Sequence, residues 1–302
     1  MSRPGTLYEA PGPIGRKRQR VVSVLSALAV CGLLAAIGVR LEASGQFEAD
    51  KWSIFFHWGT AKFLFDGLVS TLTAAVCAAL VAFAMAFPLA LGRLSPRRWM
   101  RRLAGGYIEF FRAIPLLLLI LFMVIELPSL GFDWPALGFL VFAMALHHSA
   151  LTAEVVRTGI LSLPRGQREA ALALGMRPYQ AMLFVVLPQA LRNMLPALIS
   201  SVLAIVQDTS LGYVIPYDEL LHRSQDVSSY APQSLLQAAF IVTMMYGVVS
   251  AGLLYLKRWV MRRQSRAVAK SAILRGTSMS SAVAGDIAAD VPASIAGVGS
   301  KE

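Results

Sequence analysis

The residues of this sequence that could perform chemistry are few, and they form no catalytic pattern. His147, His148 and Ser149 form a run in which histidine lies beside a possible nucleophile. Adjacent residues on a helix point about 100° apart, so the two histidines cannot share a metal ion or form a relay with Ser149. We interpret this run as polar packing between helices. An intramembrane enzyme that uses these side chains is the alternative.

Motifs for nucleotide and metal binding are also absent from the sequence. It contains no G-x-x-x-x-G-K-[ST] loop, no H-E-x-x-H and no G-x-S-x-G, so it lacks the usual means of cradling a phosphate or hydrolysing a peptide. Cys31 and Cys77 lie in apolar runs and indicate neither a disulfide framework nor a metal site. We therefore expect no cofactor, no bound metal and no enzymatic activity in this chain.

The most informative pattern lies in a polar loop between two apolar runs. Pro164 and Gly166 interrupt the preceding run, and Gln167–Leu174 consists of strong helix formers. Gly175 suits the C-terminal cap of such a helix. Three alanines would leave this helix with a slim apolar surface, which fits a groove in another protein better than it fits water. We therefore predict a short docking helix.

The composition indicates that lipid surrounds the elements on either side of this loop. Of the 302 residues 56% are hydrophobic and only 15% are charged, whereas a soluble domain carries roughly 25% charged residues. A helix that spans a bilayer needs about 20 mostly apolar residues. The sequence offers six such runs, at 21–39, 66–92, 107–127, 136–157, 188–206 and 234–256.

The distribution of charge orients these spans. The net charge of +11 could suggest nucleic acid, but the basic residues lie at the edges of apolar runs. With the N-terminus inside the cell, 24 of the 28 Lys and Arg residues fall on the cytoplasmic side. No A-x-A cleavage site follows the run at 21–39, so we expect a retained anchor. Both termini are predicted to be cytoplasmic, in a bacterial inner membrane.

Several ionisable residues fall inside or beside the spans, where they normally need a partner or a task. Glu109 and Arg112, and likewise Glu154 and Arg157, are spaced to pair on one helix face. Asp208 lacks a basic neighbour in the sequence and lies in a segment, 207–233, that we expect to be broken or re-entrant. Asp208 and the polar residues beside it either line the transport pathway or its outer gate, or form hydrogen bonds in helix packing.

Several stretches, taken together, resemble the polar amino-acid branch of bacterial ABC-importer permeases over about residues 51–263. Glu169-Ala170-Ala171 followed by Gly175 looks like the EAA loop of that family. The stretches that resemble other parts of the branch are Gly166-Gln167, Pro188-Gln189-Ala190, Phe111–Leu116 and Asp208–Leu211.

Two details refine the resemblance. Gln207 stands where most of the branch has lysine, and the runs at 171–176 and 207–214 look closest to glutamate/aspartate importer permeases. The resemblance implies an all-α polytopic membrane protein with the type I ABC-importer permease fold and about six transmembrane helices. The expected parts are a basic cytoplasmic N-terminus at 1–20, an extra transmembrane helix at 21–39, the permease domain at 51–263 with its EAA loop at about 162–188, and a disordered cytoplasmic tail at 264–302.

The resemblance also implies a complex. Two permease subunits, identical or paralogous, would join two ATP-binding subunits and an extracytoplasmic amino-acid-binding protein, and ATP hydrolysis would reside in the separate subunits. The alternative transport mechanism is a secondary transporter that needs no motor. The residues expected to contact the ATP-binding subunit are Gly166, Gln167, Glu169, Ala170, Ala171, Gly175 and Pro188. The candidates for the pathway or gate are Gln207, Asp208, Thr209, Ser210, Arg112 and Arg192.

Overall fold

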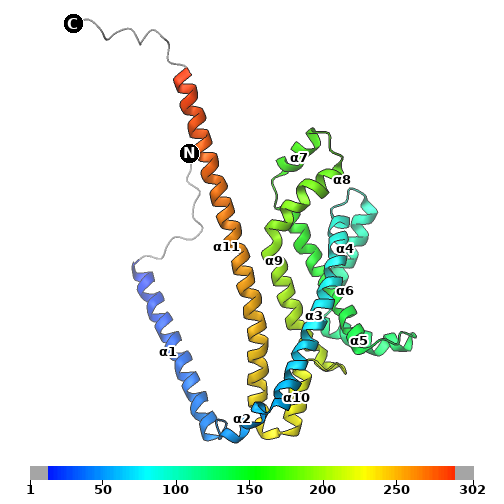
Figure 1. The fold of residues 1–302 in the computed structure, drawn as a ribbon, viewed down its shortest axis with the longest axis vertical. Helices are drawn as coiled ribbons and strands as arrows, with labels where there is room; N and C mark the ends of the chain where they lie inside the picture. The colour runs from blue at the N-terminus through cyan, green and yellow to red at the C-terminus, as the bar shows by residue number, and fades with distance from the viewer. Residues whose placement is uncertain (1–12, 290–302) are drawn as a thin grey trace, which may run out of the picture. The chain divides into compact units, whose positions relative to one another are not determined.

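The computed structural model describes residues 13–289, with side chains placed at residue 15 and from residue 17 to 264. Over this range the chain is helical and forms no strand, which confirms the predicted all-α class (Figure 1). The elements are α1 (Pro13–Ala43), α2 (Ala49–Phe56), α3 (Trp58–Arg93), α4 (Arg98–Ala113), α5 (Leu116–Ser129), α6 (Ala136–Leu161), α7 (Arg165–Ala173), α8 (Pro178–Gln180), the π-helix η1 (Ala181–Val186), α9 (Leu187–Asp208), the 3-10 helix η2 (Thr209–Val214), α10 (Leu220–Tyr230), the 3-10 helix η3 (Pro232–Ser234) and α11 (Leu235–Ala289).

Five of the described helical segments are long and apolar enough to cross a membrane, and the bent pair α4 and α5 makes a sixth if it counts as one span. The apolar run predicted as a span at 107–127 is divided between α4 and α5, which meet at an angle of 96°. Ile114, between them, has an extended backbone, with φ −80° and ψ 125°. The ring of Pro115 excludes the helical conformation from the residue before it, so the helix has to break there.

The fifth span also differs from its prediction. It runs from Pro178 to Val214, not from 188 to 206, and Pro188 lies inside it. Proline cannot donate the backbone hydrogen bond to the residue four positions earlier. The π-helix η1 ends at Val186, two residues before Pro188, and the Leu187 amide bonds the Met182 carbonyl, five residues back. This wider turn lets the helix continue through the proline.

Two units of the chain are compact, and each is described by itself. The larger comprises residues 64–223 and those from 242 onward. In it α6 is central, because it contacts α4, α5 and α9. Fully buried side chains of α5, α6 and α9 form its main core, among them Ile120, Leu140, Met144 and Ile205.

Small residues allow the spans of this unit to approach one another closely. On α3, alanines recur at every fourth position and are fully buried; such a stripe is typical of helix contacts in membranes. Where α6 meets α9, a Cβ added to Gly159 would lie 3.1 Å from the Met194 Cβ. The buried alanines of the α3 stripe are Ala74, Ala78, Ala82, Ala86 and Ala90.

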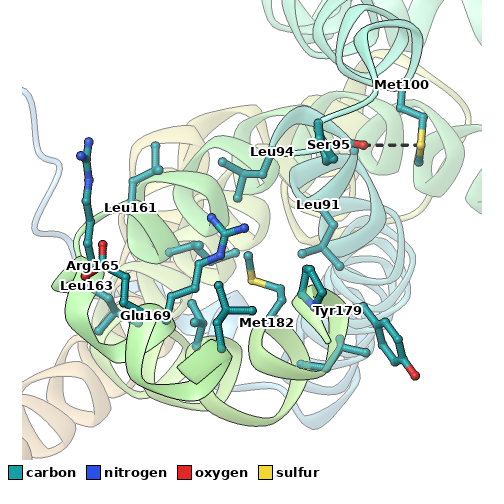
Figure 2. Close-up of a pocket in the computed structure, with 18 of the residues that line it drawn as sticks. Leu91, Leu94, Ser95, Met100, Leu161, Leu163, Arg165, Glu169, Tyr179 and Met182 are labelled. Atoms are coloured by element: carbon teal, nitrogen blue, oxygen red, sulfur yellow. Dashed lines mark hydrogen bonds between the residues drawn. The ribbon is translucent and has the colours of Figure 1, made fainter. Parts of the chain in front are cut away.

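Helix α7 lies outside the set of spans. It packs on η1 at the start of the fifth span, and a cavity separates it from the ends of α3 and α6 (Figure 2). The short helix predicted for the polar loop is therefore present.

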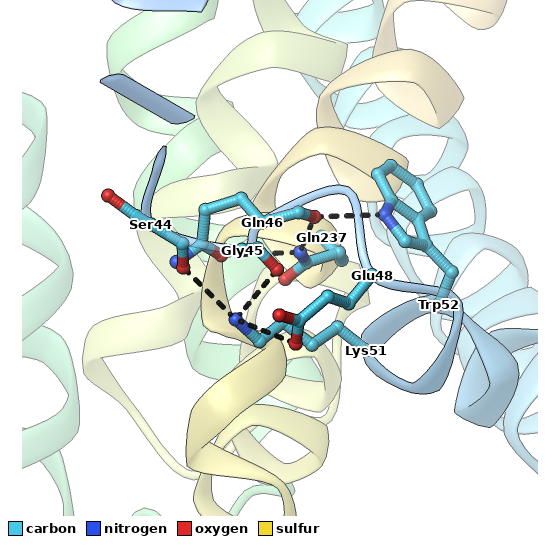
Figure 3. A network of polar contacts seen from close by, with 7 residues as sticks. All are labelled: Ser44, Gly45, Gln46, Glu48, Lys51, Trp52 and Gln237. Carbon is cyan, nitrogen blue, oxygen red and sulfur yellow. Dashed lines mark hydrogen bonds and ion pairs between the residues drawn. The ribbon is translucent and has the colours of Figure 1, made fainter. Parts of the chain in front are cut away.

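The smaller unit comprises residues up to 63 together with 224–241. Its turn between α1 and α2 is held by hydrogen bonds to backbone carbonyls (Figure 3). The Lys51 ammonium donates to the Gly45 carbonyl at 2.8 Å, and the buried Gln237 amide donates to the Gln46 carbonyl at 2.7 Å. Trp52 also donates to the Gln46 carbonyl. The bonds from Lys51 and Trp52 attach the turn to α2, and the bond from Gln237 attaches it to the start of α11.

The two terminal helices extend beyond the predicted boundaries. Helix α1 covers the predicted anchor at 21–39 and is longer at both ends; none of its residues from 17 to 43 is buried. Helix α11 continues to Ala289, past the predicted boundary at about 264, through a stretch rich in alanine. The rest of the predicted tail, and the first twelve residues of the basic N-terminus, lie outside the described residues.

Candidate functional site

The docking helix α7 ends in a complete C-terminal cap. The Met176 amide bonds the Ala171 carbonyl at 3.2 Å, and the Gly175 amide bonds the Leu172 carbonyl at 3.0 Å. This pair of bonds is the Schellman motif, which requires a left-handed residue at the position of Gly175. Gly175 has φ +81°, a conformation that other L-residues rarely adopt. The cap predicted for Gly175 is therefore confirmed.

The predicted contact residues lie on two faces of α7. Gly166, Gln167, Glu169 and Ala170 are exposed, so they are available to a partner chain. Ala171 is only 4% exposed, so it anchors α7 within this chain and cannot form part of the outer surface.

Two further features of the loop were not predicted from sequence. Leu174, at the end of α7, is 85% exposed, so a large apolar side chain lies beside the predicted contact residues. Its signal in the sequence is an apolar residue directly before the capping glycine. The Gln189 amide donates to the Gln167 side-chain carbonyl at 3.2 Å, which ties the start of α7 to α9. Pro188 is also exposed, but it lies on the helix next to Gln189.

The cavity behind α7 has a volume of about 1310 Å³. Apolar side chains form most of its wall, including Leu91 from α3, Leu94 directly after α3, and Met182 from η1 (Figure 2). Arg165 and Glu169 line it from α7. Helix α7 is held by its packing on η1, by the buried Ala171 and by the hydrogen bond between Gln189 and Gln167, while its side toward the ends of α3 and α6 faces the cavity.

The charged pairs of the spans match the sequence prediction in one case only. Arg157 and Glu154 form the predicted ion pair, at 2.8 Å. Glu109 pairs with Arg93, at 2.7 Å, and the predicted pair between Glu109 and Arg112 is wrong. The Arg93 side chain lies where a Cβ on Gly105 would be. Because glycine has no side chain, Arg93 can pass over Gly105 from α3 to reach Glu109.

The two arginines named as pathway candidates are not brought together with the polar segment. Arg112 is exposed at the end of α4 and forms no ion pair with any residue that the structure describes. Arg192 is exposed on α9, and its backbone carbonyl accepts a hydrogen bond from the Gln264 amide.

The polar segment at the end of α9 presents a mixture of buried and exposed groups. Thr209 is fully buried and donates to the Val206 carbonyl at 2.7 Å, while Ser210 donates to the Gln207 carbonyl at 2.8 Å. Both of these hydrogen bonds lie within the local helix. Gln207 is exposed and Asp208 is partly exposed, so these two have side chains available to the surroundings.

Asp208 has a basic partner that sequence reasoning missed. Its Oδ2 lies 3.1 Å from Nε2 of His148, which is buried on α6. The direction of approach falls outside hydrogen-bond geometry, so this is a close electrostatic contact. His147 faces elsewhere, with Nδ1 3.0 Å from the Phe111 carbonyl oxygen, and Ser149 lies 2.9 Å from the Tyr107 hydroxyl. The run therefore packs helices, as predicted, and His148 also brings α6 into contact with Asp208 of α9.

A buried carboxylate organises the turn between η2 and α10. Glu219 is fully buried and accepts hydrogen bonds from the Leu221 amide at 2.8 Å, the His222 amide at 2.6 Å and the Tyr246 hydroxyl at 2.8 Å. The two amides belong to the first turn of α10, where donors lack partners within the helix. Burial raises the pKa of Glu219 above its ordinary value, and the hydrogen bonds oppose that rise. The break predicted in 207–233 is therefore present, as a turn that the Glu219 carboxylate holds by hydrogen bonds.

Comparison with known proteins accounts for this arrangement. The family model described as binding-protein-dependent transport system inner membrane component matches residues 78–266. The chain is 38% identical over 231 residues to the glutamate transport system permease protein GluD of Corynebacterium glutamicum, covering 75% of this chain and 84% of the relative. It is 34% identical over 220 residues to the glutamate/aspartate import permease protein GltK of Escherichia coli O6:H1, covering 67% and 97%.

A solved structure gives the same result. The crystal structure of an amino acid ABC transporter with histidines contains a chain that is 30% identical, with a TM-score of 0.63, over 67% of this chain and 94% of the other. The resemblance and the permease fold predicted from the sequence are therefore confirmed, as is the absence of an enzymatic role, because ATP hydrolysis belongs to a separate subunit. The family match spans the structured loop α7, the pair His148 and Asp208, and the turn at Glu219. The chain belongs to the family of inner membrane components of binding-protein-dependent transport systems, as a permease subunit of an ABC importer.

Proposed function

We propose that this chain forms the translocation pathway of an ATP-driven importer of polar amino acids, and that its cargo is glutamate or aspartate. The observation that carries the proposal is the 38% identity to a glutamate transport permease over 84% of that protein. The relative from Escherichia coli, a glutamate/aspartate permease, is covered almost completely. The two share the acidic amino acid as cargo.

The ATP-binding subunit is proposed to dock on α7. The supporting features are the exposed residues Gly166, Glu169 and Ala170, the apolar Leu174 beside them, and the rigid cap at Gly175. The cavity behind α7 leaves it room to move when the motor moves. Gln167, tied to Gln189 next to Pro188, would pass that movement to the fifth span. Ala171 holds the helix on its own chain.

The pathway residues follow from charge. Arg112, exposed and without an ion pair among the residues described, is the better candidate to attract a substrate carboxylate. Asp208 would repel an acidic substrate unless a cation intervened, and His148 lies beside it. We assign Asp208 and Gln207 to a gate, and Thr209 and Ser210 to the helix that supports it. Arg192 is a second, peripheral attractor.

The assembly proposed is two permease subunits, identical or paralogous, two ATP-binding subunits and an extracytoplasmic amino-acid-binding protein. The family description itself names a binding-protein-dependent system in the inner membrane. Both termini are assigned to the cytoplasm, because 24 of the 28 Lys and Arg residues then lie inside.

The cargo is tested by reconstituting this chain into proteoliposomes with its ATP-binding subunit and its binding protein. Uptake of radiolabelled glutamate, aspartate, glutamine, arginine and histidine is measured with and without ATP. The proposal predicts ATP-dependent uptake of glutamate or aspartate that is well above uptake of the basic amino acids. ATP-dependent uptake of arginine or histidine with no uptake of acidic amino acids would overturn the assignment of cargo and leave the permease role intact.

Docking is tested by Ala170→Glu, which places a charge on the exposed face of α7. Ala49→Glu is the matched control, because Ala49 is also an exposed alanine on a short helix. We expect Ala170→Glu to abolish co-purification of the ATP-binding subunit and ATP-dependent uptake, while membrane insertion is unchanged. If both variants co-purify with the motor and transport equally, the docking assignment is wrong.

A further inference from the structure

Four arginines gather at the start of α4. Arg97, Arg98, Arg101 and Arg102 are all exposed, and no Asp or Glu occurs in the sequence between residues 67 and 108. None of the four forms an ion pair with a residue in the described part of the chain. Arg101 donates to the Ser95 carbonyl at 3.1 Å, which holds its guanidinium over the turn between α3 and α4. The cluster is therefore a concentrated positive charge with no counter-charge of its own.

An apolar groove begins beside this cluster. It lies between α3 and α4, has a volume of about 470 Å³, and its lining residues include Leu89, Trp99, Met100 and Leu103. Arg97, Arg98, Arg101 and Arg102 lie at the start of α4, the part of the helix that also carries the groove residues Trp99 and Met100. The basic cluster and the groove therefore share the N-terminal end of α4. Positive charge at one end matches the phosphate of a phospholipid, and the apolar groove that leads from it matches an acyl chain.

The exposed face of α4 favours a lipid over a protein segment as the occupant. Trp99 is 60% exposed, Leu103 is 68% exposed and Phe110 is 61% exposed, and these three fall along one side of the helix. A helix with a basic face, an apolar stripe and a tryptophan at its end is typical of an element at the membrane interface. Clusters of arginine beside a span attract anionic lipids for the same reason.

We propose that the groove between α3 and α4 binds one anionic phospholipid. Its phosphate lies among Arg97, Arg98, Arg101 and Arg102, and an acyl chain follows Leu89, Met100 and Leu103. The proposal does not depend on the cargo. It bears on coupling, because Gly92 and Met100 line both this groove and the cavity behind α7. An occupied groove therefore supports one wall of the space in which α7 moves.

The test uses the full-length chain, purified from nanodiscs of phosphatidylglycerol or phosphatidylcholine and examined by native mass spectrometry for retained lipid. The cluster variant, Arg98→Gln/Arg101→Gln/Arg102→Gln, removes three of the four arginines. The control Lys17→Gln/Arg18→Gln/Arg20→Gln removes the same charge from α1, whose residues there are also exposed. We expect the wild type and the control to retain phosphatidylglycerol, and the cluster variant to retain at least tenfold less.

A second variant separates the groove from simple surface charge. Met100→Trp enlarges a half-buried side chain within the groove and leaves every arginine in place. We expect it to lose retained phosphatidylglycerol while it elutes as a monodisperse species in size-exclusion chromatography. Equal retention of phosphatidylcholine by the wild type would overturn the proposal. Unchanged retention of phosphatidylglycerol by the cluster variant would also overturn it. If that variant retained the lipid but lost the ATP-binding subunit, the arginines would serve a protein interface.

Discussion

Replacing Gly175 with alanine tests whether the cap of α7 matters for coupling. Gly175 has φ +81°, and an L-residue in that conformation costs roughly 1–2 kcal/mol. A Cβ at this position meets no atom within 4 Å, so the cost is conformational and involves no clash within this chain. The amide bonds from Gly175 and Met176 close the cap. A cost of this size should raise the opened population of the cap about 5–30-fold.

Gly175→Asn is the matched control, because asparagine tolerates the left-handed conformation much better than alanine does. Hydrogen exchange should show that the amides of residues 175 and 176 lose protection in the alanine variant and largely keep it in the asparagine variant. ATP hydrolysis stimulated by the binding protein should fall in the same order. If both variants exchange and hydrolyse like the wild type, the cap does not position the docking surface. If Gly175→Asn lowers ATP hydrolysis as much as Gly175→Ala does, the loss comes from the added side chain on the docking surface and not from the conformation of the cap.

Three further predictions concern the structure that supports the loop and the pathway. Gly159→Val should lower the unfolding temperature in detergent through about 1–3 kcal/mol of overpacking against Met194, with Gly159→Ala less affected. Burial raises the pKa of Glu219 in the folded protein, so the folded state holds the proton more tightly than the unfolded state does. The contribution of Glu219 to stability should be greatest at a pH below the ordinary pKa of a glutamate and should fall as the pH rises through the raised pKa. Glu219→Gln should remove this dependence. A double-mutant cycle of His148→Ala and Asp208→Ala should give a coupling free energy of about 0.5–3 kcal/mol in stability.

Each of these has a contradicting result. Equal unfolding temperatures for the wild type and Gly159→Val would show that α6 and α9 are not in close contact there. An identical pH profile of stability for the wild type and Glu219→Gln would place the dependence on other groups. Strict additivity of the His148 and Asp208 variants would mean that the two side chains act independently.

The features that the sequence predicted correctly are local ones. The apolar runs predicted the spans, because a bilayer imposes a minimum length on each apolar run. Pro164, the helix formers after it and Gly175 predicted α7 and its cap, because each residue acts through its own backbone preferences. The pair Glu154 and Arg157 followed from the geometry of one helix.

The features that were missed depend on contacts between helices or on how a proline is accommodated. Glu109 could pair with Arg112 on its own helix, but Arg93 reaches it across Gly105. The contact between His148 and Asp208 joins residues 60 positions apart, and no local pattern connects them. The two prolines have opposite effects: Pro115 breaks the helix within the apolar run at 107–127, and Pro188 lies within a span that was predicted to begin there.

The central claim is that α7 of this permease docks the ATP-binding subunit. It is tested most directly by cross-linking in the reconstituted transporter, with Cys31 and Cys77 replaced and one cysteine introduced at the exposed position Ala170 or, as a control, Ala49. A bifunctional reagent should join Ala170→Cys to the ATP-binding subunit, and should not join Ala49→Cys to it, in samples that transport amino acid with ATP. Active transport with no such cross-link from position 170, or with the cross-link from position 49 instead, would contradict the account.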